Sequence, residues 1–124
     1  VRNLAYQLNF KKVVVTTPEE HDRIIAYTSQ LAHIVSSAYI KSPTAQEQSG
    51  FSAGSFKDLT RVARLNENMW TSLFLLNKEN LISEISLIIK NLNDYKNALE
   101  SDDSQALNSL LKEGRILKEK SMEL

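Results

Sequence analysis

Cysteine is absent from the 124 residues, and only three glycines and two prolines occur. Without cysteine there is no disulfide framework and no thiolate metal site, a usage that fits a cytosolic protein. With glycine only at positions 50, 54 and 114, neither the G-x-G-x-x-G turn nor a P-loop can be written. We therefore expect no bound dinucleotide of the usual kind within this chain.

An excess of charge of either sign is also missing, because 15 Lys and Arg balance 15 Asp and Glu. No basic field attracts nucleic acid or an anionic membrane. The longest apolar runs, such as residues 73–76, are far shorter than the ~20 residues that span a bilayer, and no signal peptide opens the chain. Two separated histidines, with neither an HExxH nor a G-x-S-x-G motif, argue against a metal site and against a hydrolase. We expect a cytoplasmic protein without metal, nucleic acid or membrane partners.

What the chain does have is helical patterning sufficient for one domain with one core. Thr17 and Glu20 have capping-box spacing, with Pro18 in the first turn, and the apolar periodicity continues to about Lys41. Ser42-Pro43 ends this predicted helix, and residues 44–54 read as a loop.

A short second helix is predicted from Phe56 through Ala63, with a break at residues 66–68. One long helix is then expected over residues 69–99, and a last helix, capped within residues 101–103, should pack antiparallel to it. The long helix is apolar on more than one face and must be covered on several sides. This excess of apolar surface predicts a homodimer.

The first sixteen residues do not fit the helical pattern. The chain begins with Val1 rather than Met, which suggests a piece of a longer protein, and residues 11–16 form a β-branched run typical of a strand. A lone strand needs a partner sheet elsewhere, upstream or in another subunit. A short extended linker without pairing is the alternative.

His33 and Arg61 stand among apolar residues on two predicted helices. A histidine that titrates near neutrality and a permanent guanidinium suit a small carboxylate, so the pair suggests an anion site. The alternatives are a semi-buried structural histidine and a surface ion pair between Arg61 and Asp58 three residues before it. Trp70 reads most simply as a core residue, and Gly54 precedes a helix where backbone amides could meet an anion or form a plain turn.

Four segments in this order and spacing carry a family resemblance: residues 17–22, 29–33, 54–61 and 68–70. Together they resemble the C-terminal helical domain of bacterial prephenate dehydrogenase. The resemblance implies an all-α dimerisation domain at residues 17–124 with one long central helix. Residues 1–16, including the short strand, would be the tail of an N-terminal Rossmann domain that binds NAD.

The resemblance also implies the function of the longer protein. In tyrosine biosynthesis, this oxidoreductase family carries out the NAD-dependent oxidative decarboxylation of prephenate to 4-hydroxyphenylpyruvate. The helical domain supplies the dimer interface and part of the prephenate pocket, where tyrosine is an expected inhibitor. The family's catalytic histidine lies in the nucleotide domain, so no catalytic residue and no cofactor-binding residue is expected in this chain, and the domain alone should be inactive.

Carried over residue by residue, the resemblance makes His33, Gly54 and Arg61 substrate-binding residues. Asp58 would orient Arg61, and Trp70 would support the pocket. The sequence departs from the family at Ala32, where proline is common, and at residues 53–55, where the family is richer in glycine. The alternatives are an arogenate dehydrogenase domain and a stand-alone helical interaction module in which these side chains are only structural.

Overall fold

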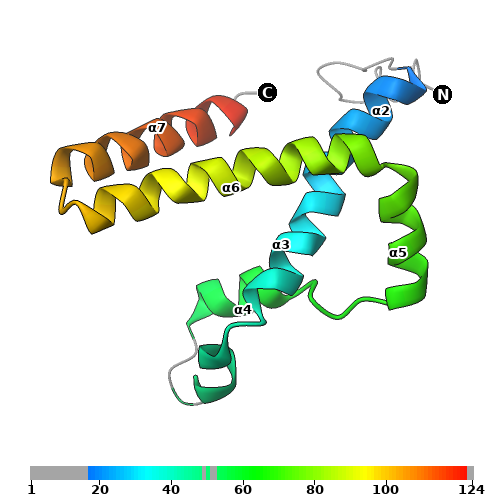
Figure 1. Cartoon of the computed structure of the whole chain (residues 1–124), viewed down its shortest axis with the longest axis horizontal. Coiled ribbons are helices and arrows are strands. Elements are labelled where there is room, and N and C mark those ends of the chain that lie inside the picture. The colour runs from blue at the N-terminus through cyan, green and yellow to red at the C-terminus, as the bar shows by residue number, and fades with distance from the viewer. Residues whose placement is uncertain (1–16, 49, 51–52, 123–124) are drawn as a thin grey trace. The chain divides into compact units, whose positions relative to one another are not determined.

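The computed structural model describes residues 17–48, 50 and 53–122. Within these ranges all regular structure is helical and no strand occurs, which confirms the predicted all-α class (Figure 1). The strand expected at residues 11–16 lies outside the described residues. The chain divides into two compact units, residues 1–84 and 85–124, which we describe in turn. No described helix is both long and apolar enough to cross a membrane.

The first unit begins with a nearly continuous helical stretch made of α2 (Pro18–Ile25), η1 (Ala26–Leu31) and α3 (Ala32–Tyr39). The predicted capping box is present, because the Glu20 amide donates to the Thr17 hydroxyl over 3.1 Å and the Thr17 amide donates to the Glu20 carboxylate over 3.4 Å. The helix predicted to about residue 41 is therefore confirmed in its start and extent. Its middle, η1, is a π-helix, a local widening that occurs often at functional sites.

The segment predicted as a loop contains a short 3₁₀ helix, η2 (Pro43–Glu47), which starts where the Ser42 hydroxyl accepts from the Thr44 amide. The next helix, α4 (Gly54–Thr60), begins two residues before the predicted start at Phe56 and ends before Ala63. Residues 61–66 then lead to α5 in turn and irregular conformation.

The long helix predicted over residues 69–99 is two helices, and that prediction was wrong. Helices α5 (Glu67–Leu76) and α6 (Lys78–Glu100) are separated at Asn77, whose φ of −116° and ψ of 31° lie outside the helical region. The physical reason is tertiary: the Asn77 side chain donates hydrogen bonds to Gln30 and to the Asp22 carbonyl, and these contacts compensate for the interrupted helix. The 23-residue α6 remains the long central helix of the prediction.

The core of the first unit is small and partly polar. Ala26 is fully buried, and Leu31 and Leu81 are each 4% exposed. Gln30 and Ser36 are the buried polar side chains of the described part of this unit. These buried residues lie on η1, on α3 and in the first turn of α6.

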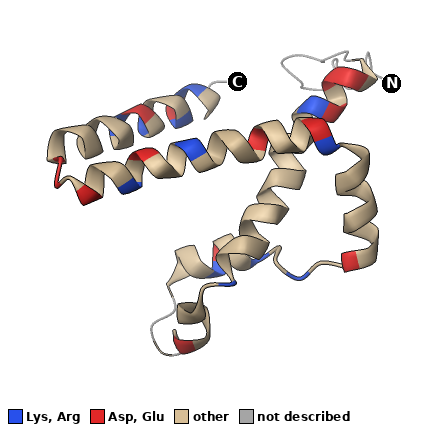
Figure 2. Ribbon diagram, in the orientation of Figure 1, with Lys and Arg blue, Asp and Glu red and all other residues tan. Residues whose placement is uncertain are grey.

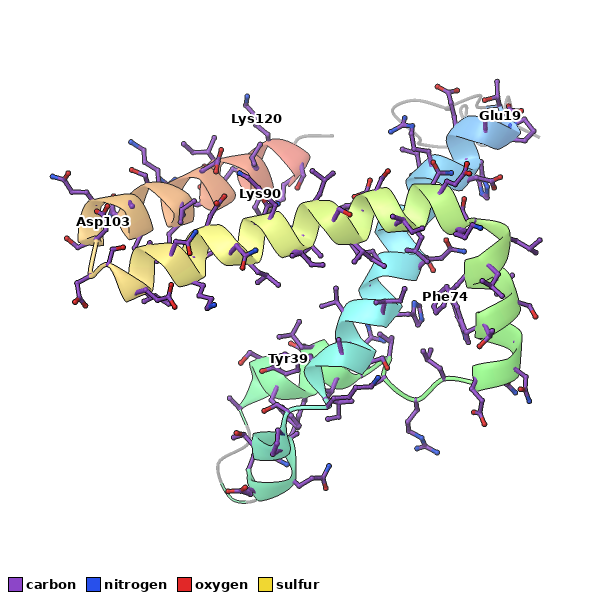
Figure 3. The ribbon with its side chains drawn as sticks, viewed as in Figure 1. Glu19, Tyr39, Phe74, Lys90, Asp103 and Lys120 are labelled. Atoms are coloured by element: carbon purple, nitrogen blue, oxygen red, sulfur yellow. The ribbon has the colours of Figure 1, made fainter. Side chains whose placement is uncertain are left out.

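The second unit is a helical hairpin in which α7 (Ser104–Met122) runs antiparallel to the C-terminal part of α6, as predicted (Figure 1). The Tyr95 hydroxyl of α6 donates to the Leu110 carbonyl of α7 over 3.3 Å. The side-chain view shows Lys90 on α6 and Lys120 on α7, with Asp103 at the turn between the helices (Figure 3). Among residues 85–122, Ala98 alone is buried.

The turn of the hairpin is determined by two neighbouring aspartates. Asp102 has a φ of +50°, and its amide donates to the Leu99 carbonyl over 3.2 Å while the Asp103 amide donates to the Ala98 carbonyl over 2.9 Å. This pattern is a Schellman motif, which normally takes glycine at the left-handed position. Asp103 then caps α7 by accepting from the Ala106 amide over 3.0 Å, so the cap predicted within residues 101–103 is confirmed and assigned to Asp103.

Candidate ligand-binding site

The structure places His33 of α3 against Trp70 of α5. Their rings stack at a centroid distance of 4.3 Å and an interplanar angle of 26°. Trp70 also contacts Phe74 one turn later on α5, with ring centroids 5.5 Å apart, and Phe74 lies on the side of α5 that faces α3 (Figure 3). His33 and Trp70 are half-buried. Their polar atoms are therefore fixed in position by packing and are still accessible to a ligand. We call this pair the imidazole–indole stack.

A hydrogen bond determines which nitrogen of His33 carries the proton. Nδ1 lies 2.7 Å from the Ser29 carbonyl oxygen. A carbonyl oxygen only accepts, so Nδ1 donates and the neutral ring leaves Nε2 with its lone pair. Neutral His33 can therefore accept a hydrogen bond from a ligand hydroxyl through Nε2, and protonated His33 can donate to a carboxylate from the same atom.

The helices that form this site carry almost no charge. Across η1, α3 and α5 the only Asp, Glu, Lys or Arg is Glu67, at the start of α5 (Figure 2). Glu67 is therefore the single carboxylate that an anionic ligand at the imidazole–indole stack could meet on these elements. An apolar, aromatic surface that presents an imidazole suits a ligand that combines a ring with a carboxylate.

The other predicted site residues lie on or beside α4. Gly54 is the first residue of α4 and is exposed, with open space where a side chain would project. Asp58 lies on α4, and Arg61 is its C-terminal cap residue. Helix α4 contacts α3, and Tyr39 at the end of α3 approaches Phe56 with ring centroids 6.3 Å apart.

Arg61 is exposed, and within residues 17–48, 50 and 53–122 it makes no ion pair or hydrogen bond through its side chain. The i,i+3 ion pair with Asp58 that the spacing suggested is thus not formed among the described residues. All five guanidinium donors remain open to a ligand. The structure brings His33 and Trp70 together, and it leaves Gly54, Asp58 and Arg61 as a separate group on the neighbouring helix.

The sequence spacing indicates two neighbours of the stack, Phe74 and Ser29, without giving their contacts. Phe74 follows Trp70 by four residues, a spacing that brings side chains together on a helix and could have indicated the contact. Ser29 precedes His33 by four residues as well, but its part is played by the backbone carbonyl, which no residue-type pattern reports. Sequence spacing therefore located the neighbours of the site better than the atoms involved.

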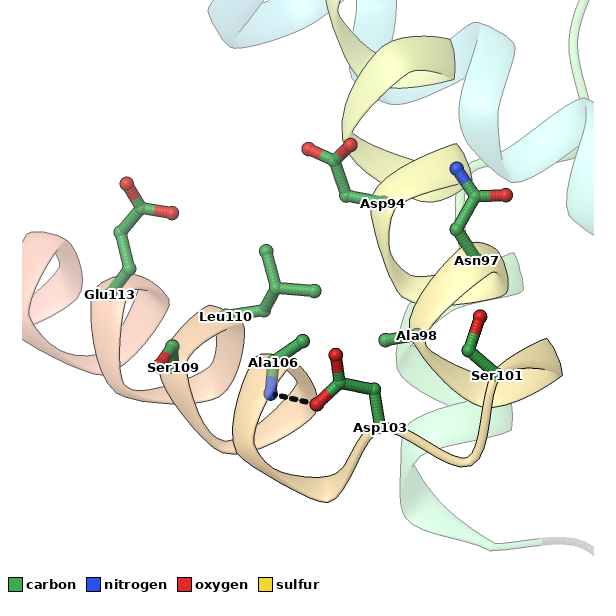
Figure 4. A pocket seen from close by; sticks show the side chains of 9 residues that line it. All are labelled: Asp94, Asn97, Ala98, Ser101, Asp103, Ala106, Ser109, Leu110 and Glu113. Atoms are coloured by element: carbon green, nitrogen blue, oxygen red, sulfur yellow. Dashed lines mark hydrogen bonds between the residues drawn. The ribbon is translucent and has the colours of Figure 1, made fainter.

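A hollow of about 590 Å³ lies within the second unit between α6 and α7 (Figure 4). Three carboxylates line it, but Asp103 caps α7 and Asp94 accepts a hydrogen bond from Lys90 over 2.9 Å. Glu113 is the third. In the part of the chain that the structure describes, no group of three or more His, Cys, Asp or Glu side chains is arranged to hold a metal ion. The hollow is therefore explained by the turn and helix cap of the hairpin.

Over the described residues, the fold and the site define an all-helical domain that holds a stacked histidine and tryptophan beside a further aromatic ring. Residues 17–113 match the family described as prephenate dehydrogenase, dimerization domain. The chain belongs to this family.

Curated relatives agree with this assignment. The chain is 30% identical over 113 residues to a prephenate dehydrogenase of Lactococcus lactis, covering 87% of the chain and 32% of the relative. It is 28% identical to the Bacillus subtilis prephenate dehydrogenase, covering 76% of the chain and 27% of the relative. A Zymomonas mobilis cyclohexadienyl dehydrogenase is 29% identical, with 84% and 38% covered. The chain thus spans about a third of the length of these relatives.

Two solved structures share the fold. Arogenate dehydrogenase from Synechocystis superposes with a TM-score of 0.76 at 22% identity, covering 89% of this chain and 42% of that one. Prephenate dehydrogenase from A. aeolicus, in complex with hydroxyphenyl propionate and NAD+, superposes with a TM-score of 0.67 at 30% identity, covering 88% and 40%. The predicted family and fold are confirmed.

Proposed function

We propose that this chain is the dimerisation and substrate-binding domain of a longer cytoplasmic enzyme that oxidises and decarboxylates prephenate to 4-hydroxyphenylpyruvate with NAD, in tyrosine biosynthesis. The observation that carries the substrate assignment is the imidazole–indole stack, with its ring contact of 4.3 Å, in a domain of the prephenate dehydrogenase family. A related protein of this family in complex with a hydroxyphenyl acid supports a ligand that combines a six-membered ring with a carboxylate.

In this proposal each site residue has a separate role in binding the ligand. Arg61 binds a substrate carboxylate through its planar fork of donors, which matches a carboxylate in two-point geometry. His33 contacts the substrate or the inhibitor tyrosine through Nε2, because Nδ1 is engaged by Ser29. Trp70 holds the imidazole plane, Gly54 leaves room at the pocket wall, and Asp58 orients Arg61 once the ligand is present.

We assign NAD to the remainder of the longer protein. The usual dinucleotide site needs closely spaced glycines between a strand and a helix, and no strand occurs within residues 17–48, 50 and 53–122. The three glycines lie apart: Gly50 is in a turn, Gly54 opens α4 and Gly114 lies inside α7. The residues of this domain therefore do not fit NAD, and we propose that residues 1–16 lead from the Rossmann domain that binds it.

The second unit supports a homodimer. Residues 85–122 expose eight large apolar side chains and bury one alanine. The exposed residues are Leu87, Ile89, Leu92, Leu99, Leu111, Ile116, Leu117 and Met122. Exposed large apolar side chains in this number indicate surfaces that another molecule covers. We call these eight residues the apolar hairpin face, and we propose that a second copy of the chain covers it.

The experiment that tests the site compares Arg61→Ala with Arg64→Ala in the longer enzyme. Both arginines are exposed and lie three residues apart after α4, so Arg64 is a matched control for charge and location. We expect Arg61→Ala to raise the KM for prephenate by roughly a hundredfold, as for loss of a charge-assisted contact of ~3 kcal/mol. Equal KM values for the two variants would refute the site.

The same assay distinguishes the substrates. Arogenate carries an amino group where prephenate has a keto group, and the relatives include a cyclohexadienyl dehydrogenase. A higher kcat/KM with arogenate than with prephenate would identify the longer protein as an arogenate dehydrogenase. Activity with neither compound would favour the stand-alone interaction module.

A further inference from the structure

Asn77 joins the two helical segments that carry the imidazole–indole stack. Its side-chain amide nitrogen donates to the Gln30 side-chain oxygen and to the Asp22 carbonyl, each over 2.8 Å. Its side-chain oxygen accepts from the Asn80 amide over 2.9 Å. Both hydrogens of the Asn77 side-chain amide are thus used in contacts within the first unit. Gln30 precedes Asn77 by 47 positions in the chain, and Asp22 precedes it by 55.

On one side, the bond holds the π-helical turn. Gln30 lies in η1 and is only 7% exposed, and a buried side-chain amide without a partner is costly. Gln30 is adjacent to Ser29, whose carbonyl accepts a hydrogen bond from His33 Nδ1. A change in the position of Gln30 would therefore shift the carbonyl that determines the His33 tautomer.

On the other side, the bond holds the tryptophan. Asn77 directly follows α5, and Trp70 lies seven residues earlier on that helix, about two turns away. A helix is stiff over two turns, so anchoring its C-terminal end restricts where the indole can lie. Asn77 thus restrains both partners of the stack, one through Gln30 and the other through α5.

We propose that Asn77 is a positioning residue that keeps His33 in the Nδ1–H tautomer and in register with Trp70. A solvated imidazole favours the Nε2–H tautomer, so the Nδ1–H form of His33 depends on the Ser29 carbonyl staying in place. Loss of the Asn77 amide removes the partner of Gln30 and releases the π-helical turn. The consequence for substrate affinity rests on the proposed binding role of His33, whereas the consequence for the tautomer does not.

The test is long-range ¹H–¹⁵N NMR of the histidine rings in the 124-residue chain, which distinguishes the two neutral tautomers. His33 and the exposed His21 are the only histidines, so His21 serves as an internal reference. Asn77→Leu removes the amide at similar volume, and Gln30→Met removes its acceptor from the opposite side. We expect His33 to be Nδ1-protonated in the wild type and to shift towards the Nε2–H form in both variants.

Asn66→Ala is the matched control. Asn66 caps the other end of α5 by accepting from the Met69 amide over 2.9 Å, so this variant weakens the same helix without touching Gln30. We expect it to keep the wild-type tautomer. An unchanged His33 tautomer in both Asn77→Leu and Gln30→Met would overturn the inference, and so would an equal change in Asn66→Ala, which would indicate a general loss of stability.

Kinetics of the longer enzyme separate this inference from the proposed function. We expect Asn77→Leu to raise the KM for prephenate about tenfold, the value of one hydrogen bond to a polar ligand, and to change kcat much less. A shifted tautomer with an unchanged KM would uphold the positioning role of Asn77 and refute the binding role of His33.

Discussion

The two units of the chain use helices in opposite ways. The first unit buries Ala26, Leu31 and Leu81 together with two polar side chains, and it holds the imidazole–indole stack. The second unit buries only Ala98 among its described residues and exposes the apolar hairpin face. The first unit thus holds side chains from two helices in one arrangement, as our proposed ligand site requires, whereas the second leaves apolar side chains uncovered, as our proposed assembly surface requires.

Charge does not compensate for the weak core of the second unit. Its ion pairs are Lys90–Asp94, Lys96–Glu100 and Arg115–Glu119, all between residues four apart on one helix and largely exposed. Pairs of this kind contribute only a few tenths of a kcal/mol each. These ion pairs therefore contribute little to the stability of the hairpin.

The largest effect that we expect, and the strongest test of the contrast between the two units, is at the apolar hairpin face. Leu92→Glu combined with Leu117→Glu should raise the dimer dissociation constant by roughly a thousandfold, because the two copies together lose four leucines and each contributes about 1 kcal/mol of apolar burial. Sedimentation equilibrium measures this change. The exposed pair Asn91→Glu and Asn108→Glu, which adds the same two negative charges, is the control for charge. A wild-type chain that stays monomeric at micromolar concentration would contradict the proposed homodimer.

A smaller effect tests the core of the first unit. Leu81→Ala should lower the free energy of unfolding by about 3 kcal/mol, since it leaves a cavity at a residue only 4% exposed. Leu76→Ala, at a leucine 85% exposed, should change it by less than about 0.5 kcal/mol. Urea unfolding followed by the fluorescence of Trp70, the single tryptophan, provides the measurement. Equal losses in the two variants would show that the first unit has no core of its own.

Two neighbouring substitutions in the hairpin turn should change the free energy of unfolding in opposite directions. Asp102→Gly should raise stability by about 0.5 to 1 kcal/mol, because glycine adopts the left-handed conformation without steric cost. Asp103→Ala should lower stability by about 1 kcal/mol, because the Ala106 amide loses its cap. Thermal unfolding of both variants checks the assignment. Changes of the same sign would argue against the Schellman turn.

The smallest expected effect concerns pH. The hydrogen bond from Lys90 to Asp94 raises the pKa of Lys90 above its ordinary value of 10.5, aided by the attraction of the two charges. A raised pKa means that the contribution of the pair is fully present below pH 10.5 and is lost as the pH rises through the higher value. Lys90→Met should remove this part of the alkaline loss of helicity, measured by circular dichroism, relative to Lys96→Met. Identical alkaline profiles for the two variants would show that the pair contributes nothing.

Much of the fold was predictable from local patterns. The capping box of Thr17 and Glu20, the end of a helix near Pro43 and the cap of the last helix all follow from residue types at fixed spacing, and each is present in the structure. The family and the all-α class were predictable as well, because motifs in register carry them. The ligand-binding or supporting roles of His33, Gly54, Asp58, Arg61 and Trp70 stay predictions.

The separation of α5 from α6 was not predictable in this way. Asn77 has an ordinary side chain in an apolar helical pattern, and only its hydrogen bonds to Gln30 and Asp22, far away along the chain, compensate for leaving the helix. The same holds for the left-handed Asp102, since nothing in its residue type requires a positive φ.

The sequence by itself determined which segments are helical, where most of them start, and which residue types are available for a ligand. Capping and periodicity are local interactions, so neighbouring residues suffice to specify them. Only the tertiary structure decided that His33 stacks on Trp70, that Asn77 bonds to Gln30, and that the apolar side chains of the hairpin stay exposed. These features depend on atoms brought together from distant positions, and periodicity along one helix carries no information about them.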